Sequence, residues 1–358
     1  MDKLSTMKIR LPLFIITLII FFAVNAGQAQ DPIFSQFYAS PMQTNPALTG
    51  VYNGQFRFIA NYKQQWNSIL QNKPFRTISA GFDMRSPVGR YDFISYGITA
   101  LTDEAGEGGF QRNTADLSLS YMKQLGGGGY RSADQYLIAG ARAGVGQFNL
   151  DPDNLWFTTQ FDLDTESIDQ SIASGEFINE SSDVFIDMAA GLMWYSVFDD
   201  NQSLYVGGAV FHANAPKYSF IDANGEETID MRWMAQFGGE FPLSDELSVL
   251  PAVIATGQGE NLLSIVGANF RYNNHDWREV AIRAGAWMHL VKDVENPISV
   301  PTYTVSAILE MGRLNVGVSY DIAANQLSTA TNNRGGFELS LIYVQPATRK
   351  VKTVCPKL

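Results

Sequence analysis

"RLNVGVSYD", residues 313–321, alternates between two kinds of side chain at every step. Successive side chains of a β-strand point to opposite faces, so this stretch is predicted to form a strand with one apolar and one polar face. The apolar face comprises Leu314, Val316, Val318 and Tyr320, and the other comprises Arg313, Asn315, Gly317, Ser319 and Asp321. The last predicted strand has two faces as well, with Leu339, Leu341 and Tyr343 on one and Glu338, Ser340 and Ile342 on the other.

The same alternation recurs along most of the chain, in segments of roughly ten residues bounded by turn residues. We count 14 such segments and predict 14 antiparallel strands. The segments are residues 56–62, 76–84, 93–101, 115–123, 136–146, 183–195, 203–212, 232–241, 247–257, 261–272, 279–290, 302–311, 313–322 and 336–344.

Charges in the middle of the polar faces favour a membrane barrel over a soluble β-sandwich, which would also alternate. Strands of about ten residues suit a tilted membrane span, with apolar residues toward lipid and polar residues toward the lumen. Aromatic residues near the strand ends, among them Tyr195 and Trp287, would suit the interfacial aromatic girdles of such a barrel. We interpret the mid-strand charges as an internal ion-pair network that fills the lumen. They are Arg57, Asp83, Asp116, Arg142, Asp187, Arg283, Glu310 and Arg313.

The connections between the segments alternate in length, which is typical of outer-membrane barrels. Residues 149–182, 213–230 and 323–335 are long connections on one side, whereas "GQGEN" (257–261) is a tight connection where a long one is expected. The sequence therefore predicts an all-β fold, a transmembrane antiparallel β-barrel of about 14 strands over residues 54–345. Short turns and both termini would be periplasmic, and the long loops extracellular.

Both ends of the chain differ from the barrel. Residues 1–29 are predicted to be a signal peptide, because a basic start, the apolar stretch 11–24 and small residues precede a cleavage site after Ala29. The alternative is a membrane anchor, although the apolar stretch falls short of the ~20 residues that a spanning helix needs. Residues 346–358 would be a basic periplasmic tail, in which Cys355 is a free thiol, or forms a mixed disulfide or part of a docking tail for a periplasmic partner.

Composition and motifs argue against several functions. A net charge of −11 argues against nucleic acid as a partner. The chain has none of the hydrolase, metalloprotease or phosphate-loop motifs, so we expect no enzyme, no catalytic residue, no cofactor and no metal. The carboxylates of the loop 151–183 lack the spacing of an EF-hand calcium site. A surface lipase would need a marked Ser–His pair, which the sequence does not show.

Residues 30–53 are apolar and irregular, and "DPIFSQFYASPMQTNPALTG" (31–50) carries almost no charge. Irregular backbone cannot lie in lipid, because its polar groups would lack partners. We therefore expect this segment to be a plug in the lumen or a docking strip for a partner. Asn45, Pro46 and Gly50 predict a compact turn within it.

Several stretches resemble the PorP/SprF family of outer-membrane proteins. They are "QDPIFSQFYASPMQTNPALTG", "FRFIANYKQQW", "PFRTISAGFDM", "GGFELSLIY" and a late "CP" pair. The resemblance spans the mature chain, but its specific part is the N-terminal sixty residues or so. It implies an outer-membrane component of the type IX secretion and gliding machinery of Bacteroidetes. Such a protein would help a cognate secreted protein, such as an adhesin, to reach or stay at the cell surface.

The partners that the resemblance implies are the C-terminal domain of a secreted cargo protein and type IX components of the outer membrane and periplasm, besides membrane lipid. We predict that Trp156, Phe157 and Phe161 bind cargo from an extracellular loop, because aromatic anchors within a polar rim are typical of protein interfaces. If not, Phe34, Phe37 and Tyr38 would bind a partner on the periplasmic side. The alternative function is a FadL-like transporter of hydrophobic small molecules.

Overall fold

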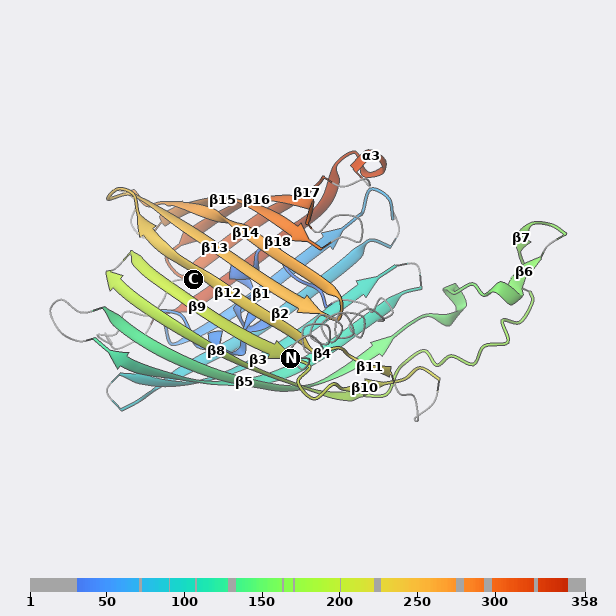
Figure 1. Cartoon of the computed structure of the whole chain (residues 1–358), viewed down its shortest axis with the longest axis horizontal. Helices are drawn as coiled ribbons and strands as arrows, with labels where there is room; N and C mark the ends of the chain where they lie inside the picture. Colours follow the sequence, from blue (N-terminus) through green and yellow to red (C-terminus); the bar gives the residue numbers. More distant parts are fainter. Residues whose placement is uncertain are drawn as a thin grey trace, which may run out of the picture.

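The computed structural model describes residues 31–70, 73–89, 91–106, 108–127, 133–162, 164–169, 171–199, 201–221, 227–274, 280–292, 298–324 and 328–346. Across these residues the chain forms a closed barrel of antiparallel strands (Figure 1). The predicted signal peptide lies outside the described residues, and so does the tail with Cys355, apart from Pro346.

Fourteen strands close the barrel in the order β1-β18-β17-β16-β15-β14-β13-β12-β9-β8-β5-β4-β3-β2, which confirms the predicted fold and strand number. Each strand overlaps one predicted segment. The strands are β1 (Phe56–Gln65), β2 (Phe75–Val88), β3 (Asp92–Ala105), β4 (Phe110–Gly126), β5 (Asp134–Asn149), β8 (Phe185–Asp199), β9 (Gln202–Phe211), β12 (Arg232–Pro242), β13 (Leu247–Gln258), β14 (Asn261–Tyr272), β15 (Val280–Val291), β16 (Ser299–Met311), β17 (Leu314–Ala323) and β18 (Arg334–Gln345).

The remaining elements are short and are not part of the barrel wall. They are the 3-10 helices η1 (Phe37–Ala39), η2 (Pro46–Leu48), η3 (Pro152–Asn154) and η4 (Thr158–Gln160), the helices α2 (Pro41–Thr44) and α3 (Ser328–Thr331), and the strand pairs β6 (Phe161–Asp162) with β7 (Ser167–Ile168) and β10 (Lys217–Tyr218) with β11 (Glu227–Thr228). None of the described helices is long and apolar enough to cross a membrane.

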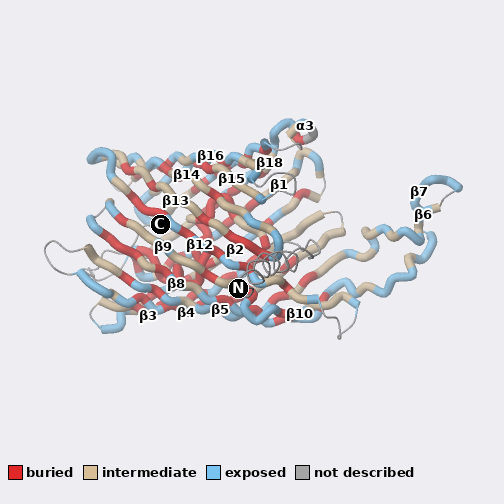
Figure 2. Tube along the Cα trace, viewed as in Figure 1, coloured by how far each residue is buried: buried red, intermediate tan, exposed pale blue. Residues whose placement is uncertain are grey.

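Strand β1 closes the barrel by pairing with β2 on one side and with β18 on the other, from Phe56↔Gln345 to Gln65↔Gly336. Closure satisfies the backbone groups that an open sheet edge would leave unpaired in lipid. The alternation sets the two faces as predicted: Leu339 is 42% exposed on the outside, whereas its neighbour Glu338 is 1% exposed on the inside. Buried residues accordingly gather along the inside of the barrel (Figure 2).

The two ends of the barrel differ, as the alternating connections predict. We call the end with residues 150–184 and 212–231 the loop end, and the end at which β1 begins and β18 ends the turn end. The connection 150–184, which carries β6 and β7, projects far beyond the loop end (Figure 1).

Three sequence-based placements of single residues are wrong. Arg313 was expected to face the lumen from a strand, but it lies exposed in the tight turn before β17. Tyr195 and Trp287, which we expected in an interfacial aromatic girdle, are 1% and 3% exposed and point inward. An aromatic residue near a strand end suits either face, so only the register decides which one it takes.

Candidate functional site

Residues 31–55, which we call the N-terminal segment, run through the inside of the barrel. Every residue from Asp31 to Tyr52 is buried or half-buried. At one end Asp31 contacts Gln258, the last residue of β13 at the loop end. At the other end the N–H of Gln55 donates to the carbonyl of Gln345, at the turn end of β18, with an N···O distance of 2.7 Å. The segment therefore spans the interior from one end of the barrel to the other.

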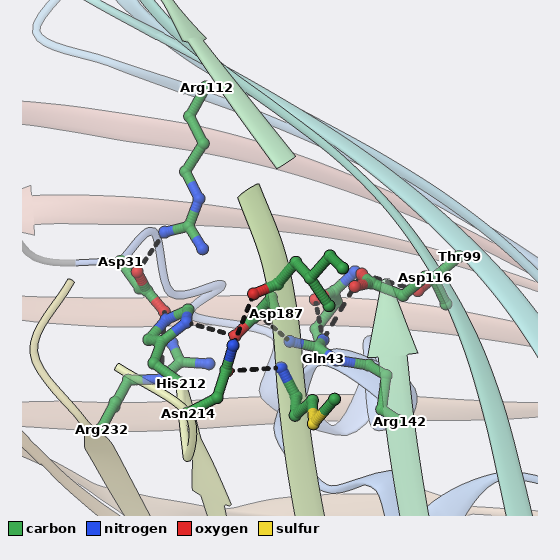
Figure 3. Close-up of polar contacts among 12 residues, drawn as sticks. Asp31, Gln43, Thr99, Arg112, Asp116, Arg142, Asp187, His212, Asn214 and Arg232 are labelled. Atoms are coloured by element: carbon green, nitrogen blue, oxygen red, sulfur yellow. Dashed lines mark hydrogen bonds and ion pairs between the residues drawn. The ribbon is translucent and has the colours of Figure 1, made fainter. Parts of the chain in front are cut away.

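Asp31 is the centre of a charged cluster at the loop end (Figure 3). Its carboxylate forms an ion pair with Arg112, lies 3.3 Å from Nε of Arg232, and lies 2.7 Å from Nε2 of His212. Its N–H donates to Oε1 of Gln258 at 2.9 Å. Burial raises the pKa of Asp31, but the guanidinium groups of Arg112 and Arg232 and the hydrogen bond with His212 outweigh it and hold this pKa well below its usual range. The carboxylate is thus ionised at neutral pH.

The cluster continues from His212 into the wall of the barrel. Nδ1 of His212 lies 2.8 Å from the carboxylate of Asp187, which lies 3.4 Å from Arg142. Arg142 also approaches Asp116 at 3.7 Å, so that β4, β5 and β8 are connected by charge (Figure 3). These contacts, with the Arg57–Asp83 and Arg283–Glu310 pairs, confirm the predicted ion-pair network inside the barrel.

A second set of contacts holds the segment against β1 and β18. The backbone N–H groups of Ser35 and Gln36 donate to the two carboxylate oxygens of Glu338, at 2.6 and 2.9 Å. Lys63 lies 3.0 Å from the same carboxylate and donates to the carbonyl of Ile33 at 2.7 Å. A buried charge is tolerated when it is paired and hydrogen-bonded, and Glu338 meets both conditions.

Aromatic side chains fill the next layer of the interior. The rings of Phe37 and Trp287 meet edge to face with centroids 5.1 Å apart, and Tyr38 lies 5.6 Å from Trp287. Phe34 and Phe37 are only 3% and 5% exposed. The structure therefore places Phe34, Phe37 and Tyr38 inside the barrel and not on a periplasmic surface.

The predicted turn at Asn45 and Pro46 forms η2. The side chain of Asn45 accepts a hydrogen bond from the N–H of Ala47 at 2.9 Å and so caps this short helix. Its amide also donates to the carbonyl of Gly208 in β9 at 3.3 Å, which ties the turn to the barrel wall.

The wall makes room for this turn with glycines. A Cβ on Gly140 of β5 would stand 2.4 Å from the carbonyl carbon of Pro46, and one on Gly191 of β8 would stand 1.9 Å from Oδ1 of Asn45. Both distances are too short for non-bonded atoms. Glycine inside a strand often marks such a close approach of another backbone.

The segment leaves the interior beside a third charged site, toward the turn end. Gly50 has φ +76°, in the left-handed region that favours glycine, as predicted. Its N–H donates to Asp83 at 2.7 Å, and Asp83 pairs with Arg57 at the same distance. The hydroxyl of Tyr52 donates to the carbonyl of Asp83 at 2.9 Å.

The aromatic residues predicted to bind cargo lie in the connection 150–184. Trp156 is 53% and Phe161 is 45% exposed, and Phe157 between them is half-buried. The sequence placed them correctly in a long loop at the loop end. The structure does not bring them into contact with Phe34, Phe37 or Tyr38, and the sequence did not predict such a contact.

Sequence reasoning missed the partners of Asp31. It gave no role to His212, Arg112 or Arg232. Asp31 and His212 are 181 residues apart, and no local spacing connects them. The three residues share one signal, which is that they are polar residues at or beside strand ends on the inward face.

Metal chemistry finds no support in the described residues, where no group of three or more His, Cys, Asp or Glu side chains could hold an ion.

Several solved structures of membrane barrels are similar to this chain. The ΔS2 mutant of the TodX monoaromatic hydrocarbon channel is 10% identical, with a TM-score of 0.49 and coverage of 85% of this chain and 93% of that chain. The Ralstonia pickettii toluene transporter TbuX is 12% identical, with a TM-score of 0.48 and coverage of 85% and 92%. CdiB from Acinetobacter baumannii is 9% identical, with a TM-score of 0.43 and coverage of 81% and 60%. No functional property follows from likeness at this level.

Comparison of the sequence with curated proteins gave no match. Comparison with protein families gave one match, which spans nearly the whole barrel. The model of the family described as type IX secretion system membrane protein PorP/SprF matches residues 26–343. The matched range includes the N-terminal segment, the charged cluster around Asp31 and all but the last residues of β18. The chain therefore belongs to the PorP/SprF family of type IX secretion system membrane proteins.

Proposed function

We propose that this protein is an outer-membrane component of the type IX secretion system that assists secretion or surface attachment of a cognate secreted protein by binding it at the loop end. In this proposal the barrel is a closed platform and the N-terminal segment is its plug. The observation that carries the proposal is the filled interior, because a barrel that contains its own buried chain is better suited to holding a partner than to passing a solute.

The contacts of the segment support the role of a plug. Three buried carboxylates tie the segment to the wall: Asp31 at the loop end, Glu338 of β18, and Asp83 toward the turn end. Removing one partner of a buried ion pair is costly, because the other charge stays buried without a partner. A segment held at three levels is expected to stay in place while a partner binds outside.

The loop end supports the binding role. Exposed aromatic side chains such as Trp156 and Phe161 are unusual for a loop that only meets water, whereas aromatic anchors dominate the energetics of protein interfaces. The family implies secretion components as partners. A C-terminal domain of the secreted cargo is the contact that we propose for this end, and a periplasmic component is the contact for the turn end.

We predict that replacing Trp156, Phe157 and Phe161 with serine releases the cognate secreted protein from the cell surface. Truncating such an anchor typically lowers the binding free energy by about 2 kcal/mol or more, so the amount of the secreted protein retained on the cell surface should fall at least tenfold. The measurement is the amount of each secreted protein on washed cells against the medium, with crosslinked pull-down of the native barrel to identify the partner.

The control is a triple serine variant of exposed residues at the turn end, Phe198, Leu243 and Met311, which should leave surface retention unchanged. Both variants should remain folded and heat-modifiable on gels. Normal retention of every secreted protein in the first variant would refute binding at this loop.

A FadL-like transporter of hydrophobic small molecules is the alternative that the assay must separate. Uptake of a hydrophobic probe into liposomes carrying the purified protein, above the rate of empty liposomes, would favour transport over the proposed platform.

A further inference from the structure

The connection 150–184, which we call the arm, exposes large apolar side chains that no other part of the described chain covers. Phe177 is 89% exposed, and its exposed companions in the arm are Trp156, Phe161, Ile168 and Ile172. None of them belongs to a buried cluster of the described residues. Exposing this much apolar surface to water is unfavourable, so such a group of side chains marks an interaction surface.

The charge of the arm has a single sign. No Lys or Arg occurs between Arg142 and Lys217, while the arm contains nine carboxylates. They are Asp151, Asp153, Asp162, Asp164, Glu166, Asp169, Glu176, Glu180 and Asp183. In the described part of the chain none of the ion pairs includes an arm carboxylate, in contrast to the paired charges inside the barrel.

Local hydrogen bonds keep two of these carboxylates charged. The backbone N–H of Asp164 donates to Asp162 at 2.9 Å, and the hydroxyl of Ser171 donates to Asp169 at 2.6 Å. These bonds hold the pKa of Asp162 and the pKa of Asp169 below their usual range. Both carboxylates therefore carry a negative charge at neutral pH.

The base of the arm is fixed to the barrel. The N–H of Leu150 donates to the carbonyl of Glu180 at 2.9 Å, and the N–H of Ser182 donates to the carbonyl of Phe148 at 2.8 Å. Beside these hydrogen bonds the ring of Phe148 packs at a tilt against the ring of Tyr218, with centroids 4.6 Å apart, and against the ring of Phe185, with centroids 5.3 Å apart. The arm thus starts from a packed aromatic base. It extends beyond the loop end, where most of it is half-buried or exposed (Figure 2).

Charge separates the possible occupants of the arm. Anionic membrane surfaces attract basic segments and repel acidic ones, so a lipid surface is the wrong partner for the arm. A second copy would bring an equally acidic arm to the contact. A protein face rich in Lys and Arg around an apolar patch matches both the sign of the charge and the exposed aromatics.

We propose that the arm is a docking surface for a protein with a basic contact face, in which Trp156, Phe161 and Phe177 enter the apolar centre and the arm carboxylates form the rim. This deepens the proposed function and rests on it, since the partner is the secreted protein held at the loop end. The carboxylates steer the encounter and select the partner, and the aromatics supply most of the affinity.

Carbodiimide, which couples carboxylates directly to lysine amines, tests the proposal on intact cells that carry the native protein. We expect mass spectrometry to find arm peptides joined to lysines of one secreted protein. Raising the salt concentration from about 0.05 to 0.5 M before coupling should lower the yield severalfold, because salt screens exposed charges. Coupling that maps only outside the arm, or a yield that does not respond to salt, would overturn the proposal.

A charge-removing pair provides the second measurement. Glu176→Gln with Glu180→Gln should reduce surface retention about threefold to tenfold, whereas the matched pair Asp245→Asn with Glu246→Gln at the turn end should not change it. One outcome is that the triple serine variant of Trp156, Phe157 and Phe161 releases the partner while the Glu176→Gln, Glu180→Gln pair does not. That result would overturn the basic contact face of the partner and leave the proposed function standing. If neither variant releases a protein, the proposed function itself fails.

Discussion

Asp31 is the residue that fixes the N-terminal segment at the loop end, because four side chains from separate strands and loops converge on it. Arg112, Arg232 and His212 contact its carboxylate, and Gln258 accepts from its N–H. The pKa of Asp31 is lowered, so its contribution is fully present above the ordinary aspartate pKa of ~3.9 and is lost as the pH falls through the lower folded value. At neutral pH the segment is thus held at its full strength.

We predict that Asp31→Ala loosens the segment without opening the barrel wall. Removing one partner of a buried ion pair costs about 3–5 kcal/mol, because the remaining charges are left buried, so local opening should rise at least a hundredfold. Chymotrypsin treatment of the folded protein, followed by mass spectrometry, should then show cleavage after the buried residues Phe34 and Phe37. Asp245→Ala, an exposed aspartate at the turn end, should cleave there no faster than the unchanged protein. Equal cleavage in both variants would argue against Asp31 as the main tie.

At the scale of elements, the fit between η2 and the glycines of β5, β8 and β9 decides whether the turn can lie against the wall. The strands satisfy the pattern of a barrel without these glycines, and alanine or serine on the inward face would serve equally well in the absence of the segment. Gly140 and Gly191 leave no space for a side chain because the backbone and side chain of Asn45 and Pro46 occupy it.

We predict that Gly140→Val displaces the turn and raises the conductance of the purified protein in planar bilayers. The added side chain would overlap the backbone of Pro46, and overpacking of this kind costs about 1–3 kcal/mol or forces the neighbour to move. Gly126→Val in β4 is the matched control, since nothing lies within 4 Å of its Cβ position. Unchanged conductance with Gly140→Val, in a protein that still folds, would show that the turn can shift without opening a path.

For the whole molecule, the filled interior gives a prediction about permeability. The unchanged protein should show no large, steady conductance, because paired charges and the N-terminal segment occupy a lumen that a barrel of this size leaves narrow. Deleting residues 31–50 should produce stable openings in planar bilayers. A large conductance before the deletion, or none after it in a barrel that remains heat-modifiable, would contradict the role of a plug.

The sequence by itself determined the number of strands, their faces and the difference between the two ends. Alternation with a period of two is a local property, and lipid on one side demands an apolar residue at nearly every second position, as in β17 and β18. The inward charges could likewise be predicted, since Asp83 and Arg142 interrupt otherwise apolar stretches. The ends of the strands were predicted less accurately. Strand β4, for example, is 17 residues long and extends past both ends of the predicted segment 115–123.

Only the tertiary structure decided which charges meet and where the N-terminal segment runs. The pairing of Arg142 with both Asp116 and Asp187 depends on the register of three strands, and that of Asp31 with His212 joins residues 181 positions apart. The segment has no period that would fix its path, so its course follows from the cavity that the closed wall leaves. Closure of the barrel brings distant inward side chains within a few ångströms of one another, and this geometry has no counterpart in any local stretch of the chain.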